Sequence, residues 1–123
     1  MHEGFVAYVL DLLTDWGGVS ARRMFRSHGL YRQGAMFGLV SKDVLYLRVD
    51  DRNRGDFVAA GSRPFRYQRG PDREIEMGAY MECPPDVIEN AEDMVGWATK
   101  ALSAALAAKA AKRVPPTASR RRS

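Results

Sequence analysis

The feature that most constrains the fold is a series of four short runs of alternating apolar and polar residues between positions 19 and 50. Gln33-Gly34 and Lys42-Asp43, which separate three of these runs, are typical of tight turns. Antiparallel strands accept such short connections, whereas parallel strands need a crossover of about a dozen residues or more. The sequence therefore predicts an antiparallel meander. Its four expected strands are residues 19–25, 30–32, 36–41 and 44–50.

Helical patterns lie on both sides of this meander. Apolar residues recur at three- and four-residue spacing over about residues 3–16, and Gly17-Gly18 then ends the helix. The elements expected after the meander are a short helix (52–61), two strands (65–68 and 75–82), one helical turn (86–89) and a long helix that follows the N-cap Asn90 and reaches about Lys112. This order predicts a two-layer α+β fold. An antiparallel sheet of five or six strands would carry the N-terminal helix and the long C-terminal helix on one face.

The basic residues are concentrated near the C-terminus. The chain holds 19 basic and 15 acidic residues, and residues 109–123 contain six of the basic and none of the acidic ones. Residues 1–108 therefore hold 13 basic and 15 acidic residues, a net charge of −2. We expect a folded domain over residues 1–112 and a disordered basic tail over residues 113–123, because VPPTASRRRS is too polar to pack.

Arg120, Arg121 and Arg122 of this tail are candidate nucleic-acid contacts. About six cations predict weak, non-specific DNA binding that salt removes. A solvated terminus without a function explains the same residues equally well.

Composition also bears on the compartment. No apolar run approaches the roughly 18 residues of a membrane span. The first sixteen residues contain acidic side chains and no basic n-region, which argues against a signal peptide. Cys83 is the only cysteine, so an intrachain disulfide is excluded. We expect a cytoplasmic protein that does not contact membranes.

Three glycines in the meander raise the question of a phosphate-binding loop. Gly29 and Gly34 have the spacing of such a loop, but neither a lysine nor a hydroxyl follows Gly34. A strand is expected next, so a helix N-terminus with convergent amide donors is missing. We therefore assign Gly34 to a hairpin turn with positive φ. Gly29 and Gly38 are assigned to crowded positions or to a β-bulge.

The sequence has no recognisable catalytic or metal-binding pattern. Neither His2 nor His28 belongs to a Cys-x-x-Cys or His-Glu-x-x-His motif, and no serine lies in G-x-S-x-G. Cys83 precedes two prolines and is interpreted as a small, buried or half-buried residue. Glu74 and Glu76 share a strand face as a carboxylate pair does, although a solvated strand edge explains them as well. We expect no enzymatic activity, no cofactor and no metal.

The arginines at the start of the meander are candidate partner or nucleic-acid contacts. Arg22 and Arg23 should point to opposite faces of the first strand, and Arg26 follows in the connection. One of the pair is then solvated, while the other pairs with a carboxylate such as Asp50 or has a function. A surface charge at the sheet edge is the alternative for this cluster.

The sheet face opposite Leu45, Leu47 and Val49 is also rather apolar. The residues expected on this second face are Met36, Val40, Val44 and Tyr46. If helices cover only one face, the second face needs a cover, which a homodimer or a peptide partner would supply. The alternative is that both faces are covered within the chain.

Several short motifs together resemble the N-terminal domain of the TfoX/Sxy competence regulators. The motifs are Arg23-Met24-Phe25, Gly29-Leu30-Tyr31, Met36-Phe37-Gly38-Leu39 and Leu45-Tyr46-Leu47-Arg48-Val49-Asp50, followed by Gly61, Pro64-Phe65 and Trp97-Ala98. The resemblance covers about residues 3–108. Arg26 departs from the family pattern, in which a glycine usually follows Met-Phe.

The resemblance implies an α+β fold likened to secretion chaperones, and a role as a transcriptional co-activator of natural transformation genes. It implies no catalytic residues. Full-length regulators carry a second, helical domain, where this chain has a short basic tail. We therefore expect a stand-alone regulatory or adaptor module that acts by contact with a protein, such as a component of the transcription machinery. The alternative is weak nucleic-acid association through the tail.

Overall fold

The computed structural model of the protein describes residues 2–24 and 26–112. Its helices are α1 (His2–Leu12), α2 (Arg54–Ala59), α3 (Pro85–Ile88) and α4 (Ala91–Lys112). Its strands are β1 (Ser20–Met24), β2 (Ser27–Arg32), β3 (Ala35–Ser41), β4 (Val44–Arg48), β5 (Pro64–Gln68) and β6 (Glu74–Glu82). All neighbouring strands are antiparallel, in the order β1-β2-β3-β4-β6-β5. The predicted α+β class and order of elements are confirmed.

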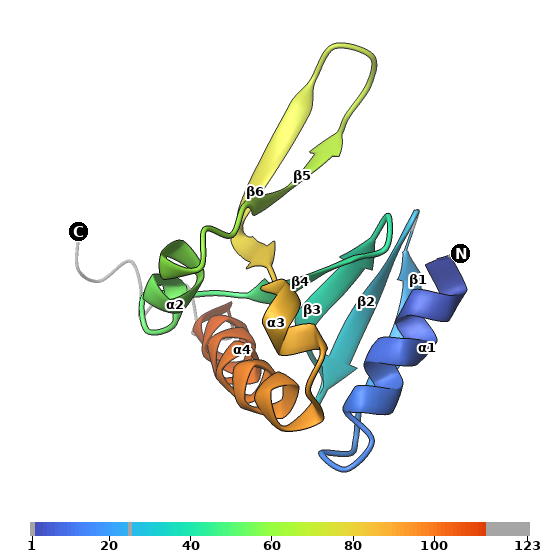
Figure 1. The fold of residues 1–123 in the computed structure, drawn as a ribbon. Coiled ribbons are helices and arrows are strands. Elements are labelled where there is room, and N and C mark those ends of the chain that lie inside the picture. Colours follow the sequence, from blue (N-terminus) through green and yellow to red (C-terminus); the bar gives the residue numbers. More distant parts are fainter. Residues whose placement is uncertain (1, 25, 113–123) are drawn as a thin grey trace, which may run out of the picture.

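The helices pack against one face of the sheet and form the second layer (Figure 1). The main core lies between the layers. Its fully buried members include Val9, Leu13, Leu30, Phe37, Leu45, Leu47, Met94, Ala98 and Ala101. Ala98 and Ala101 lie on the buried side of α4, where short side chains allow the helix to approach β3 and β4 closely. The predicted placement of the N-terminal and long C-terminal helices on one face is confirmed.

Two tight turns set the register of the meander. Gln33 and Gly34 have φ values of 55° and 75°, and Lys42 and Asp43 have φ values of 53° and 62°. Positive φ at both central residues is the property of the type I′ turn, whose twist matches that of the flanking strands. The predicted hairpin turns are therefore confirmed, including the positive φ at Gly34.

A β-bulge in β3 corrects the predicted position of Val40. The pairing partners in β3 jump from Met36 to Gly38 between two consecutive residues of β2, so Phe37 is an extra residue. One extra residue inverts the facing of every residue beyond it. Val40 therefore packs into the main core and is 2% exposed, while Leu39 lies on the opposite face. The prediction that Met36 and Val40 share a face is wrong.

The β5–β6 hairpin leaves the plane of the meander (Figure 1). Pro64 pairs with Met81, but the next residue, Phe65, pairs with Met77, so residues 78–80 form a large irregularity in β6. The Arg54 guanidinium of α2 donates a hydrogen bond of 3.1 Å to the carbonyl of Gly78 within this bend. The bend turns the outer half of the hairpin across the face that the helices do not cover.

Candidate partner-binding groove

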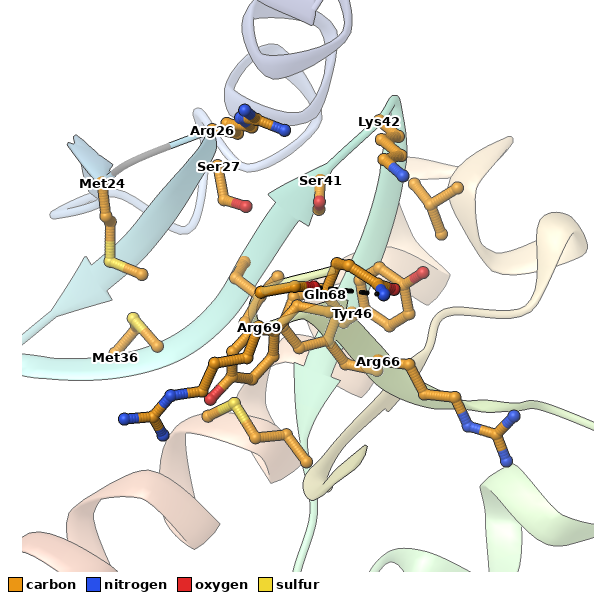
Figure 2. A pocket seen from close by; sticks show the side chains of 16 residues that line it. Met24, Arg26, Ser27, Met36, Ser41, Lys42, Tyr46, Arg66, Gln68 and Arg69 are labelled. Atoms are coloured by element: carbon orange, nitrogen blue, oxygen red, sulfur yellow. Dashed lines mark hydrogen bonds between the residues drawn. The ribbon is translucent and has the colours of Figure 1, made fainter. Parts of the chain in front are cut away.

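The face of the sheet opposite the helices carries a groove of about 960 Å³, called the open-face groove below (Figure 2). Its floor is formed by Met36, Leu39 and Tyr46 of the meander, and its wall by Phe65, Tyr67 and Met77 of the β5–β6 hairpin. Its rim carries Arg26, Lys42, Arg66 and Arg69. The groove therefore exists because the bend in β6 brings the hairpin over β3 and β4.

A second, smaller apolar cluster joins the wall of the groove to its floor. The Phe65 ring meets the Tyr46 ring edge-to-face with centroids 4.9 Å apart, and it stacks on Tyr67 at 5.9 Å. Leu39 and Phe65 are buried in this cluster. Tyr67 is 37% exposed and presents its ring to the groove. Aromatic contacts of this kind each contribute about 0.5–1.5 kcal/mol beyond buried area, so the wall is fixed to the floor.

Methionines supply much of the apolar lining. Met24, Met36 and Met77 line the groove and are half-buried. Gly29 makes room for two of them, since a Cβ at that position would lie 2.8 Å from the Met36 sulfur and 3.2 Å from the Met24 sulfur. The predicted role of Gly29 in relieving crowding is therefore confirmed. Unbranched thioether side chains can repack around ligands of different shape.

The groove is positively charged. Of the described residues that line it, four are cationic and none is Asp or Glu. Arg66 is ion-paired outside the lining, with its Nη2 atom 2.9 Å from Oε1 of Glu76. Arg26 and Lys42 lie on one side of the apolar centre, at the same end of the meander, and Arg69 of the hairpin lies on the other side (Figure 2). Clefts lined by one sign of charge concentrate ligands of the opposite sign.

Two tyrosine hydroxyls near the groove stay protonated at neutral pH. Burial, followed by the charge of Glu82, raises the pKa of Tyr46, although Arg63 opposes the shift. Burial also raises the pKa of Tyr80, whose hydroxyl donates a hydrogen bond of 3.0 Å to the carbonyl of Met36. This hydrogen bond ties β6 to β3 beneath the groove.

The arginines of the sheet edge lie on opposite faces, as predicted. The Arg22 guanidinium lies over the Tyr31 ring, 4.9 Å from its centroid, while Arg23 alternates with it along the edge strand β1 and is exposed. The suggested partner Asp50 instead pairs with Arg52 at 2.7 Å. The hydrogen bond from Arg52 lowers the pKa of Asp50. The prediction that Asp50 pairs with Arg22 or Arg23 is therefore wrong.

The predicted second face is largely the floor of the groove. Met36, Val44 and Tyr46 all line the groove, whereas Val40 belongs to the core on the other side of the sheet. Arg26 lies at the rim of the same groove. The groove therefore brings together a candidate contact arginine and the candidate second face, which were predicted as separate sites. Arg120, Arg121 and Arg122, together with the remainder of the predicted tail 113–123, lie outside the described residues.

Sequence reasoning missed the half of the groove that the hairpin supplies. Phe65, Arg66, Tyr67 and Met77 were predicted as strand residues, and Phe65 also as part of a family motif, but neither they nor Arg69 were predicted to line a binding site. The alternation of Phe65 and Tyr67 was a signal that they share one face. No local signal revealed that this face turns back onto the meander.

Reactive groups elsewhere in the described residues are buried or solvated. Cys83 is 2% exposed, and burial raises the pKa of its thiol to about 12, with a smaller contribution from Glu82. Its interpretation as a small buried residue is confirmed. Glu74 and Glu76 are both exposed. Within residues 2–24 and 26–112, no three His, Cys, Asp or Glu side chains gather in a way that could hold a metal ion.

The same part of the chain was searched for membrane-spanning helices. Among the described residues, no helix combines the length and the apolar character that crossing a membrane requires.

Comparison with protein families matches the chain to one family model. The model of the TfoX N-terminal domain covers residues 11–105, which is well over half of the chain. The matched range begins in α1, includes every strand and ends in α4. This match confirms the resemblance that the sequence motifs indicated. Comparison with curated proteins gave no match.

Proposed function

Because the chain belongs to the TfoX N-terminal domain family, a family of competence-related regulatory modules, we propose that it is a regulatory adaptor that binds a protein partner in the open-face groove. The proposal includes a non-enzymatic mode of action and a role in transcriptional regulation. It also places the protein in the cytoplasm, in keeping with its single, buried thiol.

The observation that supports this proposal is an apolar sheet face that no helix of residues 2–24 and 26–112 covers. All described members of the smaller cluster beneath the groove lie on strands. Apolar surface that is bordered by polar side chains is typical of a protein–protein contact. The aromatic contact of Phe65 and the hydrogen bond of Tyr80 hold the groove in shape before a partner arrives. A preformed site loses less entropy on binding.

Affinity capture with the full-length protein tests this proposal. The variant Met36→Gln/Tyr67→Gln makes the floor and wall of the groove polar, and Val58→Gln is a matched control because Val58 is 63% exposed on α2. Central apolar contacts cost about 2 kcal/mol or more when removed, which is over tenfold in affinity. We expect the double variant to capture at least tenfold less partner protein than the unmodified chain. Val58→Gln should capture as much as the unmodified chain. Equal capture by all three proteins would rule out the groove as the binding surface.

A second candidate function is weak DNA association through residues 109–123. The concentration of six cations without an acidic residue favours it. Full-length protein should bind duplex DNA at low salt with a log–log salt slope no steeper than about −5. Residues 1–108 should not bind. Retained binding by the shorter chain would move the nucleic-acid contact to the folded domain.

A further inference from the structure

We propose that the open-face groove recognises an acidic, amphipathic peptide segment of another protein. This inference rests on the proposed adaptor function and specifies the chemistry of its partner. Such a segment would place two or three large apolar side chains in the groove and acidic side chains at its rim.

The size of the groove sets the number of apolar anchors. A cavity of about 150 Å³ holds one benzene-sized group. The open-face groove of about 960 Å³ is several times larger and lies at the upper end of the range of small-molecule pockets. It therefore accommodates several side chains of one segment rather than a single group.

The lining indicates that these anchors are apolar and variable in shape. Met24, Met36 and Met77 line the groove together with Leu39 and Tyr46. Surfaces rich in methionine repack around different apolar side chains and bind families of related peptides. A groove with such a lining selects for apolar character more than for one defined side chain.

The rim determines the charge of the partner. Arg26 in the β1–β2 turn and Lys42 in the β3–β4 turn lie at the same end of the meander, and Arg69 follows β5 on the hairpin, so the rim has cations on both the meander and the hairpin side. None of the described lining residues offsets them with a carboxylate. Several separated anionic groups satisfy this arrangement better than the single headgroup of a fatty acid. Acidic residues that flank the apolar anchors supply them, and they also accelerate encounter.

A second copy of the chain that docks groove to groove is disfavoured by charge. The rim of Arg26, Lys42 and Arg69 would then meet an identical rim, and like charges across an interface cost several kcal/mol. Residues 113–123 of the chain itself are also basic and lack an acidic residue, so they are unsuited to this site by charge.

Single-stranded nucleic acid is the less favoured class of ligand. Proteins that bind single strands rely on aromatic side chains on which the bases stack. Here the Phe65 ring is 7% exposed and lies against the Tyr46 ring. Tyr67 is 37% exposed, and Tyr46 on the floor is only half-buried. Two partly accessible rings on a methionine-rich surface match a peptide better than a run of stacked bases.

Selection from a display library of random twelve-residue peptides tests the inference on the full-length chain. We expect the enriched peptides to contain both Asp or Glu and large apolar residues. The strongest peptide is then synthesised in two forms, as selected and with every Asp and Glu replaced by Asn and Gln. Fluorescence anisotropy measures the binding of both forms.

Two variants distinguish the effect of charge at the groove rim from the effect of the protein's net charge. Lys42→Gln/Arg69→Gln removes two cations from the groove, whereas Lys100→Gln/Lys112→Gln removes two exposed cations of α4, outside the groove. We expect the first to weaken binding of the acidic peptide about five- to tenfold, the second less than twofold, and neither to affect the neutral peptide. The neutral peptide should bind the unmodified protein about tenfold more weakly than the acidic one.

The possible failures are distinguishable. If Met36→Gln/Tyr67→Gln abolishes binding but Lys42→Gln/Arg69→Gln leaves it unchanged, the partner is not acidic and the adaptor function survives. If neither variant affects binding, the groove is not the site and both proposals fail. An absence of enriched peptides overturns the inference, as does a homodimer that Met36→Gln/Tyr67→Gln dissociates. Tighter binding of oligo(U) or palmitate than of the acidic peptide overturns it as well.

Discussion

The two faces of the sheet are built from alternating residues of the same strands, yet they differ in chemistry. The helix-covered face carries Leu30, Phe37 and Leu47, all fully buried, and short alanines complete its packing from α4. The open face carries half-buried Met36 and Tyr46, surrounded by cations. Branched and aromatic side chains with few rotamers suit a permanent contact, whereas methionine suits a contact that is made and lost. The residue composition of each face therefore suits the way it is covered: the helices cover one face permanently, whereas the open face suits a partner that binds and dissociates.

The largest expected effect compares two neighbours on opposite faces. Phe37→Ala removes a fully buried ring from the main core and should lower the free energy of unfolding by about 3–5 kcal/mol. Met36→Ala on the open face should cost about 1 kcal/mol, because Met36 is only half-buried. Urea unfolding of both variants measures the contrast. Equal losses would show that the open face is packed as tightly as the covered one.

The covered face should also protect its thiol. Burial raises the pKa of Cys83 to about 12, above the value of about 8.5 for an exposed thiol. Iodoacetamide at pH 8 should therefore modify the native protein at least a hundredfold more slowly than the protein in urea, as measured by mass spectrometry. Since the folded pKa is the higher one, this group stabilises the fold fully below about pH 8.5, and the contribution is lost as the pH rises toward 12. Similar rates in both states would contradict the burial of Cys83.

An intermediate effect concerns the wall of the groove. Arg54→Ala removes the hydrogen bond to Gly78 in the bend of β6 and should cost about 1–2 kcal/mol. Hydrogen exchange should become about tenfold faster in residues 64–77 and stay unchanged in β2 and β3. Arg66→Ala, which loses an exposed ion pair in the same hairpin, is the control. Uniform acceleration across the sheet would show that Arg54 stabilises the whole domain rather than the wall.

The smallest effect uses methionine oxidation as a probe of both faces. Met36 and Met77 of the groove should be oxidised by dilute hydrogen peroxide several-fold faster than Met81 and Met94, which are 7% and 0% exposed in the main core. Peptide mapping by mass spectrometry gives the rate for each residue. Equal rates would mean that the two faces do not differ in access to solvent.

Local signals in the sequence predicted most of the fold. Alternation identified the strands, and turn residues identified the hairpins. Asn90 was predicted as an N-cap, and its side-chain oxygen accepts a hydrogen bond of 3.0 Å from the amide of Asp93. Each of these features depends on residues that are close together in the chain, which is why they could be predicted without an alignment.

The facing of residues beyond Phe37 could not be predicted. Residues 35–40 are all apolar or glycine, so an extra residue leaves no break in the pattern. The rim of the groove was missed for a different reason. Strand pairing places Arg26 and Lys42 at the same end of the meander, but only the tertiary bend at residues 78–80 brings Arg69 of the hairpin to the same site.

The central claim is that the open face is the one that receives a partner. Carbon-13 labelling of the methionine methyl groups in the full-length protein, followed by NMR titration with the selected acidic peptide, tests it most directly. The account predicts that the signals of Met24, Met36 and Met77 shift, while those of Met81 and Met94 in the main core stay in place. Shifts confined to Met81 and Met94, or equal shifts on both faces, would contradict it.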